Sequence, residues 1–131
     1  MRTITFRGLR TDGKGWVYGG YFQHTPDEDG VRYYIFDFNE GAVEVMPESV
    51  GQFTGLHDKN GKEIYEGDII KFSQWALGSY SEKISVKSTG IAEWSLNKGK
   101  WFIENDLWDL GIFSDREVIG SIYENPELLE K

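Results

Sequence analysis

The stretch from Gln52 to Phe72 constrains the fold most, because its glycines divide it into short strands and tight turns. Asn60-Gly61 is the strongest hairpin signal in it, since a type I′ turn needs positive φ at both central residues. The run Tyr65–Asp68 predicts a second turn, after which a strand resumes at Ile69. A strand–turn–strand unit of this kind commonly begins a small curled barrel.

Aromatic and β-branched residues predict strands along most of the remaining chain. The predicted strands are Thr3–Gly8, Trp16–Phe22, Val31–Phe38, Ala42–Met46, Ile84–Lys87, Ile91–Trp94, Trp101–Ile103 and Glu117–Tyr123. The strongest is Val31–Phe38, whereas Trp16–Phe22 carries bulky groups on both faces. Within the latter strand, Gly19-Gly20 predicts a bulge or a close approach by another backbone or ring.

Short helical turns are predicted at three places. Pro47–Val50 forms one turn with Pro at its start. Asn105–Ser114 allows one or two turns with Asp106 as the N-cap. At the end of the chain, Asn125 caps a turn that begins at Pro126.

One long loop is predicted between the strands, over Ser73–Lys83, where the strand pattern weakens. Trp75 lies in this segment and allows two interpretations. It is either an exposed residue that contacts a partner or a lid folded back on the core.

A chain of 131 residues with 5 Trp, 7 Tyr and 8 Phe can bury a core, and we expect a single domain over residues 1–131. The expected fold class is mainly β, as a β-rich α+β protein. We expect a small curled or SH3-like barrel of short antiparallel strands and hairpins, with at most one or two short helices including a C-terminal turn. The chain has no Cys, which excludes disulfides, thiolate zinc sites and cysteine nucleophiles.

The formal net charge is -8, from 22 acidic residues against 14 Lys and Arg. An acidic surface disfavours non-specific binding to nucleic acid and to anionic membranes. No stretch approaches ~20 apolar residues, and Met1–Arg7 lacks the apolar core of a signal peptide. We therefore expect a soluble protein of the cytoplasm, with no membrane partner and with nucleic acid disfavoured as a partner.

Glu63, Glu66 and Asp68 form the densest acidic cluster beside a predicted turn. Carboxylates can act as general acid and base or bind Mg²⁺, which makes a small metal-assisted hydrolase one alternative function. The competing interpretation is structural, because Asp68 can accept a hydrogen bond from the backbone of its own turn. His24 and His57 lack the spacing of metal ligands. No catalytic, cofactor-binding or metal-binding residue is assigned.

Two blocks of the chain, Gln52–Phe72 and Glu117–Leu129, carry a resemblance to a known family. Together they resemble the YopX family of small proteins from bacterial phages and integrated prophages, and the second block resembles the family's C-terminal signature. The N-terminal Ile4–Arg7 also fits, whereas Ser73–Phe113 matches poorly. The resemblance implies a β-rich fold with a small barrel-like part in a phage or prophage setting, and it supplies no catalytic residues.

The expected function is that of an accessory protein in a bacterial host, which is not an enzyme and acts by binding an unknown protein or by self-association. Strand edges and exposed aromatic rings are the features that such a protein would use. The candidate interaction surface consists of Lys62, Glu63, Tyr65, Glu66, Asp68 and Trp75. A further alternative is a regulatory protein that either binds nucleic acid or mimics DNA. Binding would use a stacking, basic strip of Lys59, Lys62 and Lys71 with Tyr65 and Phe72, whereas mimicry would use the acidic surface.

Overall fold

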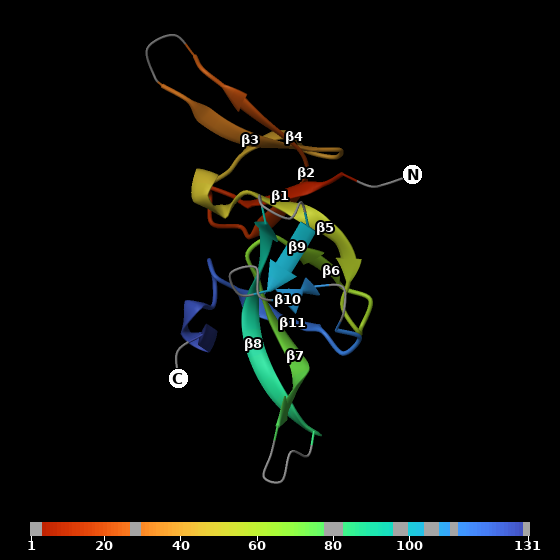
Figure 1. Ribbon diagram of the computed structural model, residues 1–131. Helices are drawn as coiled ribbons and strands as arrows, with labels where there is room; N and C mark the ends of the chain where they lie inside the picture. Colours follow the sequence, from red (N-terminus) through yellow and green to blue (C-terminus); the bar gives the residue numbers. More distant parts are fainter. Residues whose placement is uncertain are drawn as a thin grey trace. The chain divides into compact units, whose positions relative to one another are not determined.

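The structure is a computed structural model that describes residues 4–26, 30–77, 83–95, 100–103, 108–110 and 113–129. Antiparallel strands dominate it, and the helical segments of the described residues are single 3-10 turns (Figure 1). The mainly β prediction is therefore confirmed. The chain divides into two compact units, Met1–Gly55 and Leu56–Lys131. The prediction of one domain over residues 1–131 stays a prediction.

The first unit is a meander of antiparallel strands that continues through a 3-10 turn into a fifth strand. Its elements are β1 (Phe6–Leu9), β2 (Trp16–His24), β3 (Arg32–Asp37), β4 (Gly41–Glu44), the 3-10 turn η1 (Pro47–Ser49) and β5 (Gly51–His57), whose last two residues belong to the second unit. The neighbouring strands follow the order β4-β3-β2-β1-β5. Pro47 opens η1 as the sequence predicts, because its fixed φ suits the first position of a helical turn.

A bridge between Arg10 and Val45 joins the end of β1 to the end of β4, so the meander curls back on itself. Ser49 in η1 secures this closure, since its hydroxyl accepts a hydrogen bond from the Leu9 N–H at 2.7 Å and donates to the Met46 carbonyl at 2.6 Å. The curled sheet encloses a small core of buried aliphatic side chains: Val17, Ile35, Val43 and Val45. The first unit is thus a small curled barrel.

Gly19 marks the close approach that the Gly19-Gly20 pair predicts. A Cβ built at Gly19 would overlap the backbone carbonyl oxygen of Phe36 on the neighbouring strand. Only glycine fits there, because any side chain would push β2 and β3 apart.

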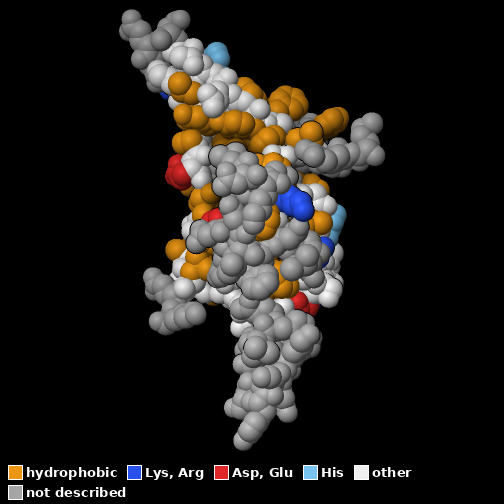
Figure 2. Space-filling view, in the orientation of Figure 1, with side chains coloured by type: hydrophobic (Ala, Val, Ile, Leu, Met, Phe, Trp, Pro, Cys, Tyr) orange, Lys and Arg blue, Asp and Glu red, His pale blue; other side chains and the backbone are white. Residues whose placement is uncertain are grey.

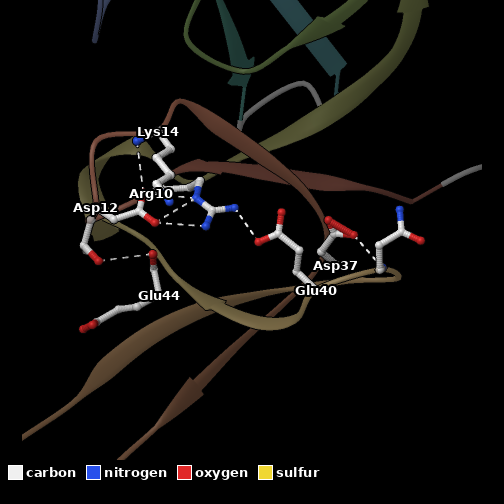
Figure 3. A network of polar contacts seen from close by, with 8 residues as sticks. Arg10, Asp12, Lys14, Asp37, Glu40 and Glu44 are labelled. Atoms are coloured by element: carbon white, nitrogen blue, oxygen red, sulfur yellow. Dashed lines mark hydrogen bonds and ion pairs between the residues drawn. The ribbon is translucent and has the colours of Figure 1, made fainter.

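A polar network holds the rim of this unit, where the β1–β2 loop meets the β3–β4 turn (Figure 3). Arg10 donates to Asp12 at 2.9 Å and to Glu40 at 2.7 Å. Hydrogen bonds from Arg10 and from the backbone N–H of Lys14 lower the pKa of Asp12 from 3.8 to about 2. The Asp37 carboxylate accepts from the Asn39 N–H at 2.8 Å and shapes the neighbouring turn. These contacts fix the loops that end the strands.

The second unit contains a hairpin and a five-stranded antiparallel sheet. Its elements are β6 (Glu63–Tyr65), β7 (Asp68–Leu77), β8 (Lys83–Ser95), β9 (Lys100–Ile103), β10 (Trp108–Asp109), β11 (Glu117–Ser121) and the C-terminal 3-10 turn η4 (Pro126–Leu129). The sheet order is β10-β9-β8-β7-β11. The core consists of Ile64, Ile70, Phe72, Ala92, Ile103, Leu110 and Phe113. The predicted C-terminal helical turn is confirmed as η4.

The prediction of a loop over Ser73–Lys83 is wrong for most of that segment. Ser73–Leu77 continues β7 and pairs with Lys83–Lys87 of β8 in an unbroken antiparallel register. The segment forms a strand because β8 supplies partners for its backbone hydrogen bonds, although its own residue pattern is a weak strand signal. Residues 78–82 lie outside the described part of the chain.

Of the helical turns predicted over Asn105–Ser114, the described residues bear out only a 3-10 position at Leu110, and the two residues before it form a strand. Trp108 and Asp109 form β10, which pairs with Ile103 and Phe102 of β9. The edge strand β9 offers hydrogen-bond partners to this segment. Pairing with them outweighs the local helical preference that the short apolar spacing suggests. Asp106, the predicted N-cap, lies outside the described residues.

The predicted hairpin near Gly61 exists, but its turn is longer than a two-residue type I′ turn. The Gly61 N–H donates to the Asp58 carbonyl at 2.9 Å, and the Asp58 N–H donates to the Lys62 carbonyl at 2.8 Å. The Asp58 carboxylate favours this longer turn, because its Oδ1 accepts from the N–H groups of Asn60 and Lys62, both at 2.9 Å. Gly61 keeps the predicted positive φ, at 84°.

Candidate functional site

Several exposed aromatic rings of the first unit share one face of the β2–β3–β4 sheet, which we call the aromatic face. It consists of Tyr18, Phe22, Tyr34 and Phe36. In the register Phe22 lies opposite Tyr34, and Phe36 lies opposite Gly20 and Ala42, so these residues share one side of the sheet. The opposite side carries Val17 and Ile35 of the core. Figure 2 shows hydrophobic side chains gathered over this part of the surface.

The rings of the aromatic face are well exposed for their size. Tyr18 is 47% exposed, Phe22 39% and Phe36 53%. Phe22 and Tyr34 stack across the two strands, with ring centroids 5.3 Å apart and planes inclined by 16°. Stacking fixes the position of both rings, so less conformational freedom would be lost when a partner covers them.

Gly20 makes a gap in the middle of the aromatic face. It lies between Tyr18 and Phe22 on β2, and it pairs with Phe36 on β3. No atom of the described residues lies within 4 Å of the position that a Cβ at Gly20 would occupy. The face therefore combines projecting rings with an open space beside them.

The aromatic face is nearly neutral within an acidic chain. The charged side chains that share its side of β3 and β4 are Arg32, which is exposed, and Glu44, which is half-buried opposite Tyr34. These two charges cancel, and Arg7, which lies opposite Tyr18 on β1, is only 5% exposed, whereas the whole chain carries -8. A nucleic-acid surface needs an excess of exposed positive charge, which these residues do not provide.

The six residues of the predicted interaction surface differ in exposure. Lys62 and Glu63 are exposed and Glu66 is half-buried, but Tyr65 is only 2% exposed and Asp68 only 1%. The Tyr65 hydroxyl donates to Glu63 at 3.2 Å, and the Asp68 carboxylate accepts from the Tyr65 N–H at 2.8 Å. Trp75 lies on β7 opposite Ser85, and its side chain lies outside the described part.

Asp68 thus uses one carboxylate oxygen for its own turn, as the structural interpretation predicts. Among the described residues, no group of three or more His, Asp and Glu side chains could hold a metal ion. The geometry therefore gives no support to a hydrolase site built from Glu63, Glu66 and Asp68.

Two other acidic residues of the second unit are structural in the same way. Asp58 accepts from the backbone N–H of Val118 on β11 at 3.0 Å, in addition to the two turn N–H groups. Burial raises the pKa of Asp58, but the three backbone hydrogen bonds outweigh it and leave the pKa below its ordinary value. Hydrogen bonds from Ser73 and then Lys87 hold the pKa of Asp115 far below its usual range. Both carboxylates bind neighbouring elements together.

A family model described as YopX protein matches residues 5–130, nearly the whole chain. The chain belongs to the YopX family. Among solved structures, this YopX protein is similar to protein EF1440 from Enterococcus faecalis, with 26% identity and a TM-score of 0.55. That match covers 99% of the YopX chain and 100% of the other chain. A comparison with curated proteins gave no significant match. No helix among the described residues of this YopX protein is long and apolar enough to cross a membrane.

The aromatic face was not singled out from the sequence, although its signals are present there. Val31–Phe38 has bulky residues on alternate positions of both faces, and Trp16–Phe22 does too. Period-2 patterns do not show which of two apolar faces is buried, because either one can pack on a core. The pairing register and the closure at Val45 decide it.

Proposed function

We propose that this YopX protein is a phage or prophage accessory protein that acts by binding, in the cytoplasm of a bacterial host, and that the aromatic face is its contact surface. The observation that carries the proposal is the set of three rings, each 39–53% exposed, on one side of a sheet whose other side is already filled by the core. Exposed Tyr and Phe rings that cluster on a monomer are typical of protein-binding surfaces.

The chemistry of the face favours a protein as the partner. Its centre is apolar and its accessible charges on β3 and β4 cancel, which matches the depletion of charge at the centre of protein–protein interfaces. The stacked Phe22 and Tyr34 rings are rigid, and rigid rings lose little freedom on binding. A catalytic role has no comparable support among the described residues, whose buried carboxylates are bonded to backbone.

Hydroxyl-radical footprinting tests the proposal, because it measures the oxidation of individual aromatic side chains. Three samples are compared: dilute purified protein, concentrated purified protein, and dilute protein in a lysate of a bacterial host. Oxidation of Tyr18, Phe22 and Phe36 should fall in at least one of the last two samples. Phe38, which is 98% exposed in the β3–β4 turn, serves as the internal reference. Equal oxidation of the face rings in all three samples would refute the proposed function.

A further inference from the structure

We infer that the partner of the aromatic face is the same face of a second copy, with Phe36 of one copy entering the gap above Gly20 of the other. This inference rests on the proposed function, since it names the partner of that same face. Three properties of the face lead to it: its shape, its charge and its area.

The shape of the face is self-complementary. In a two-fold dimer, residue i of one copy contacts residue j of the other, and residue j of the first contacts residue i of the second. The face meets this condition with one projecting group and one adjacent gap. Phe36 is the most exposed of its rings, at 53%, and it stands directly across the strand pair from Gly20. No described atom lies within 4 Å of the Cβ position at Gly20, so a ring can approach the backbone there.

The charge of the face permits two copies of an acidic chain to meet. Each copy carries -8 overall, so most pairings of two surfaces bring like charges together. On the aromatic face, Arg32 lies at the start of β3 and Glu44 lies at the end of β4. These two charges cancel, and Arg7, which lies opposite Tyr18 on β1, is only 5% exposed, so two copies that meet through this face do not bring acidic surfaces together. A single-stranded nucleic acid, which could also stack on the rings, would gain little from a neutral face.

The exposed area fits a weak dimer. At about 150–250 Å² for a whole aromatic side chain, the exposed parts of Tyr18, Phe22 and Phe36 offer roughly 300 Å² per copy. Two copies then bury roughly 600 Å² of ring surface, and the neighbouring side chains must supply the rest of the ~1,000 Å² that a specific interface needs. The expected dimer is therefore reversible and forms at micromolar concentrations.

Sedimentation velocity from about 1 to about 300 µM measures the association, a range that brackets the affinity of such a small interface. Wild-type protein should shift from monomer to dimer over this range. Gly20→Leu fills the gap, and it should fold normally because the described structure leaves space for its side chain. Phe36→Ser removes the projecting ring. Either substitution should raise the dissociation constant at least about tenfold, as the loss of a central interface residue does.

Phe38→Ser is the matched control, because it removes a more exposed phenylalanine, at 98%, that lies in the turn beyond β3. It should leave the dimer unchanged, and far-UV circular dichroism should show the same fold for all variants. A wild-type chain that stays monomeric at every concentration would overturn the inference, as would a dimer that Gly20→Leu and Phe36→Ser do not weaken. In footprinting, protection of the face rings in lysate alone would reject the second copy and leave the proposed function standing.

Discussion

Removing the Asp58 carboxylate is expected to destabilise the second unit more than a turn residue normally would. Asp58 Oδ1 accepts from Asn60 and Lys62 within the turn, and Oδ2 accepts from Val118 on β11, 60 residues later in the chain. Asp58 is only 7% exposed. In Asp58→Ala the two turn N–H groups can still reach water, but the Val118 N–H is half-buried and loses its acceptor.

The magnitude follows from these three bonds. A hydrogen bond to a charged group contributes about 1.5–3 kcal/mol, and we assign this to Val118. The two turn bonds contribute about 0.5–1 kcal/mol each, because water replaces the carboxylate there. Asp58→Ala should therefore lower the free energy of unfolding by about 2.5–5 kcal/mol, a large part of the ~5–15 kcal/mol of a typical domain. Asp58→Asn keeps one acceptor for the turn but loses the bond to Val118, so it should cost about 2 kcal/mol.

Urea unfolding followed by tryptophan fluorescence measures these losses. Four of the five tryptophans lie in the second unit with Asp58, so the signal reports on that unit. Asp37→Ala is the control, because Asp37 also bonds a turn N–H, that of Asn39, but its hydrogen bond stays within the turn; since Asp37 lies in the first unit, far-UV circular dichroism follows the unfolding of both variants as well. It should cost under about 1 kcal/mol. If Asp58→Ala costs no more than Asp37→Ala, the bond to Val118 does not stabilise the unit and the reasoning is refuted.

The same carboxylate gives a pH dependence. Because the pKa of folded Asp58 lies below its ordinary value of 3.8, its contribution to stability is fully present above that pH. The contribution is lost as the pH falls through the lowered folded-state pKa. Asp115, whose pKa is lowered as well, acts in the same direction. Acid titration of stability below about pH 4 should be shallower in Asp58→Asn than in the wild type, and identical slopes would contradict this assignment.

Three further substitutions test the fold. Gly19→Ala should prevent closure of the first unit or lower its free energy of unfolding by more than about 3 kcal/mol, because the added Cβ would overlap the Phe36 carbonyl. Gly20→Ala should be neutral or slightly stabilising, and the urea midpoints of the two variants compare them. Phe72→Ala should lower the free energy of unfolding by about 3–5 kcal/mol, since Phe72 is fully buried with its ring centroid 4.5 Å from that of Phe113. A loss under about 1 kcal/mol in thermal unfolding would contradict this, because it would mean that neighbouring side chains fill the cavity. Arg10→Gln should leave the urea midpoint nearly unchanged because the carboxylates that it pairs with are exposed, yet NMR titration should show the pKa of Asp12 rising from about 2 toward 3.8.

Sequence reasoning succeeds where a local signal decides the structure. Pro47 and Pro126 open 3-10 turns because proline fixes φ wherever it stands. The close approach of the Phe36 backbone to Gly19 has a local signal too, since consecutive glycines in a strand mark a place where another backbone comes near. Turn residues and strand residues together predict a mainly β chain, and the structure has one.

It fails where the decision depends on partners distant in the chain. Ser73–Leu77 has a weak pattern of its own and becomes a strand because β8 pairs with it. Trp108–Asp109 looks helical alone and becomes a strand at the edge of β9. The burial of Tyr65 follows from packing that the turn around it does not reveal. For the aromatic face, the sequence offers two apolar sides, and only the closure between Arg10 and Val45 shows which one is covered.

The pairing of β1 with β5 also has a consequence for the order of events during synthesis. Gln52, which pairs with Phe6, is made 46 residues after it, or roughly 2–9 s later at ~5–20 residues per second. The β2–β3–β4 meander is complete once Glu44 emerges, before β5 exists. At that stage both sides of the meander are exposed to water: the aromatic face on one side and the core side chains, not yet covered, on the other. A fragment ending at residue 44 should therefore aggregate, while one that includes β5 should not.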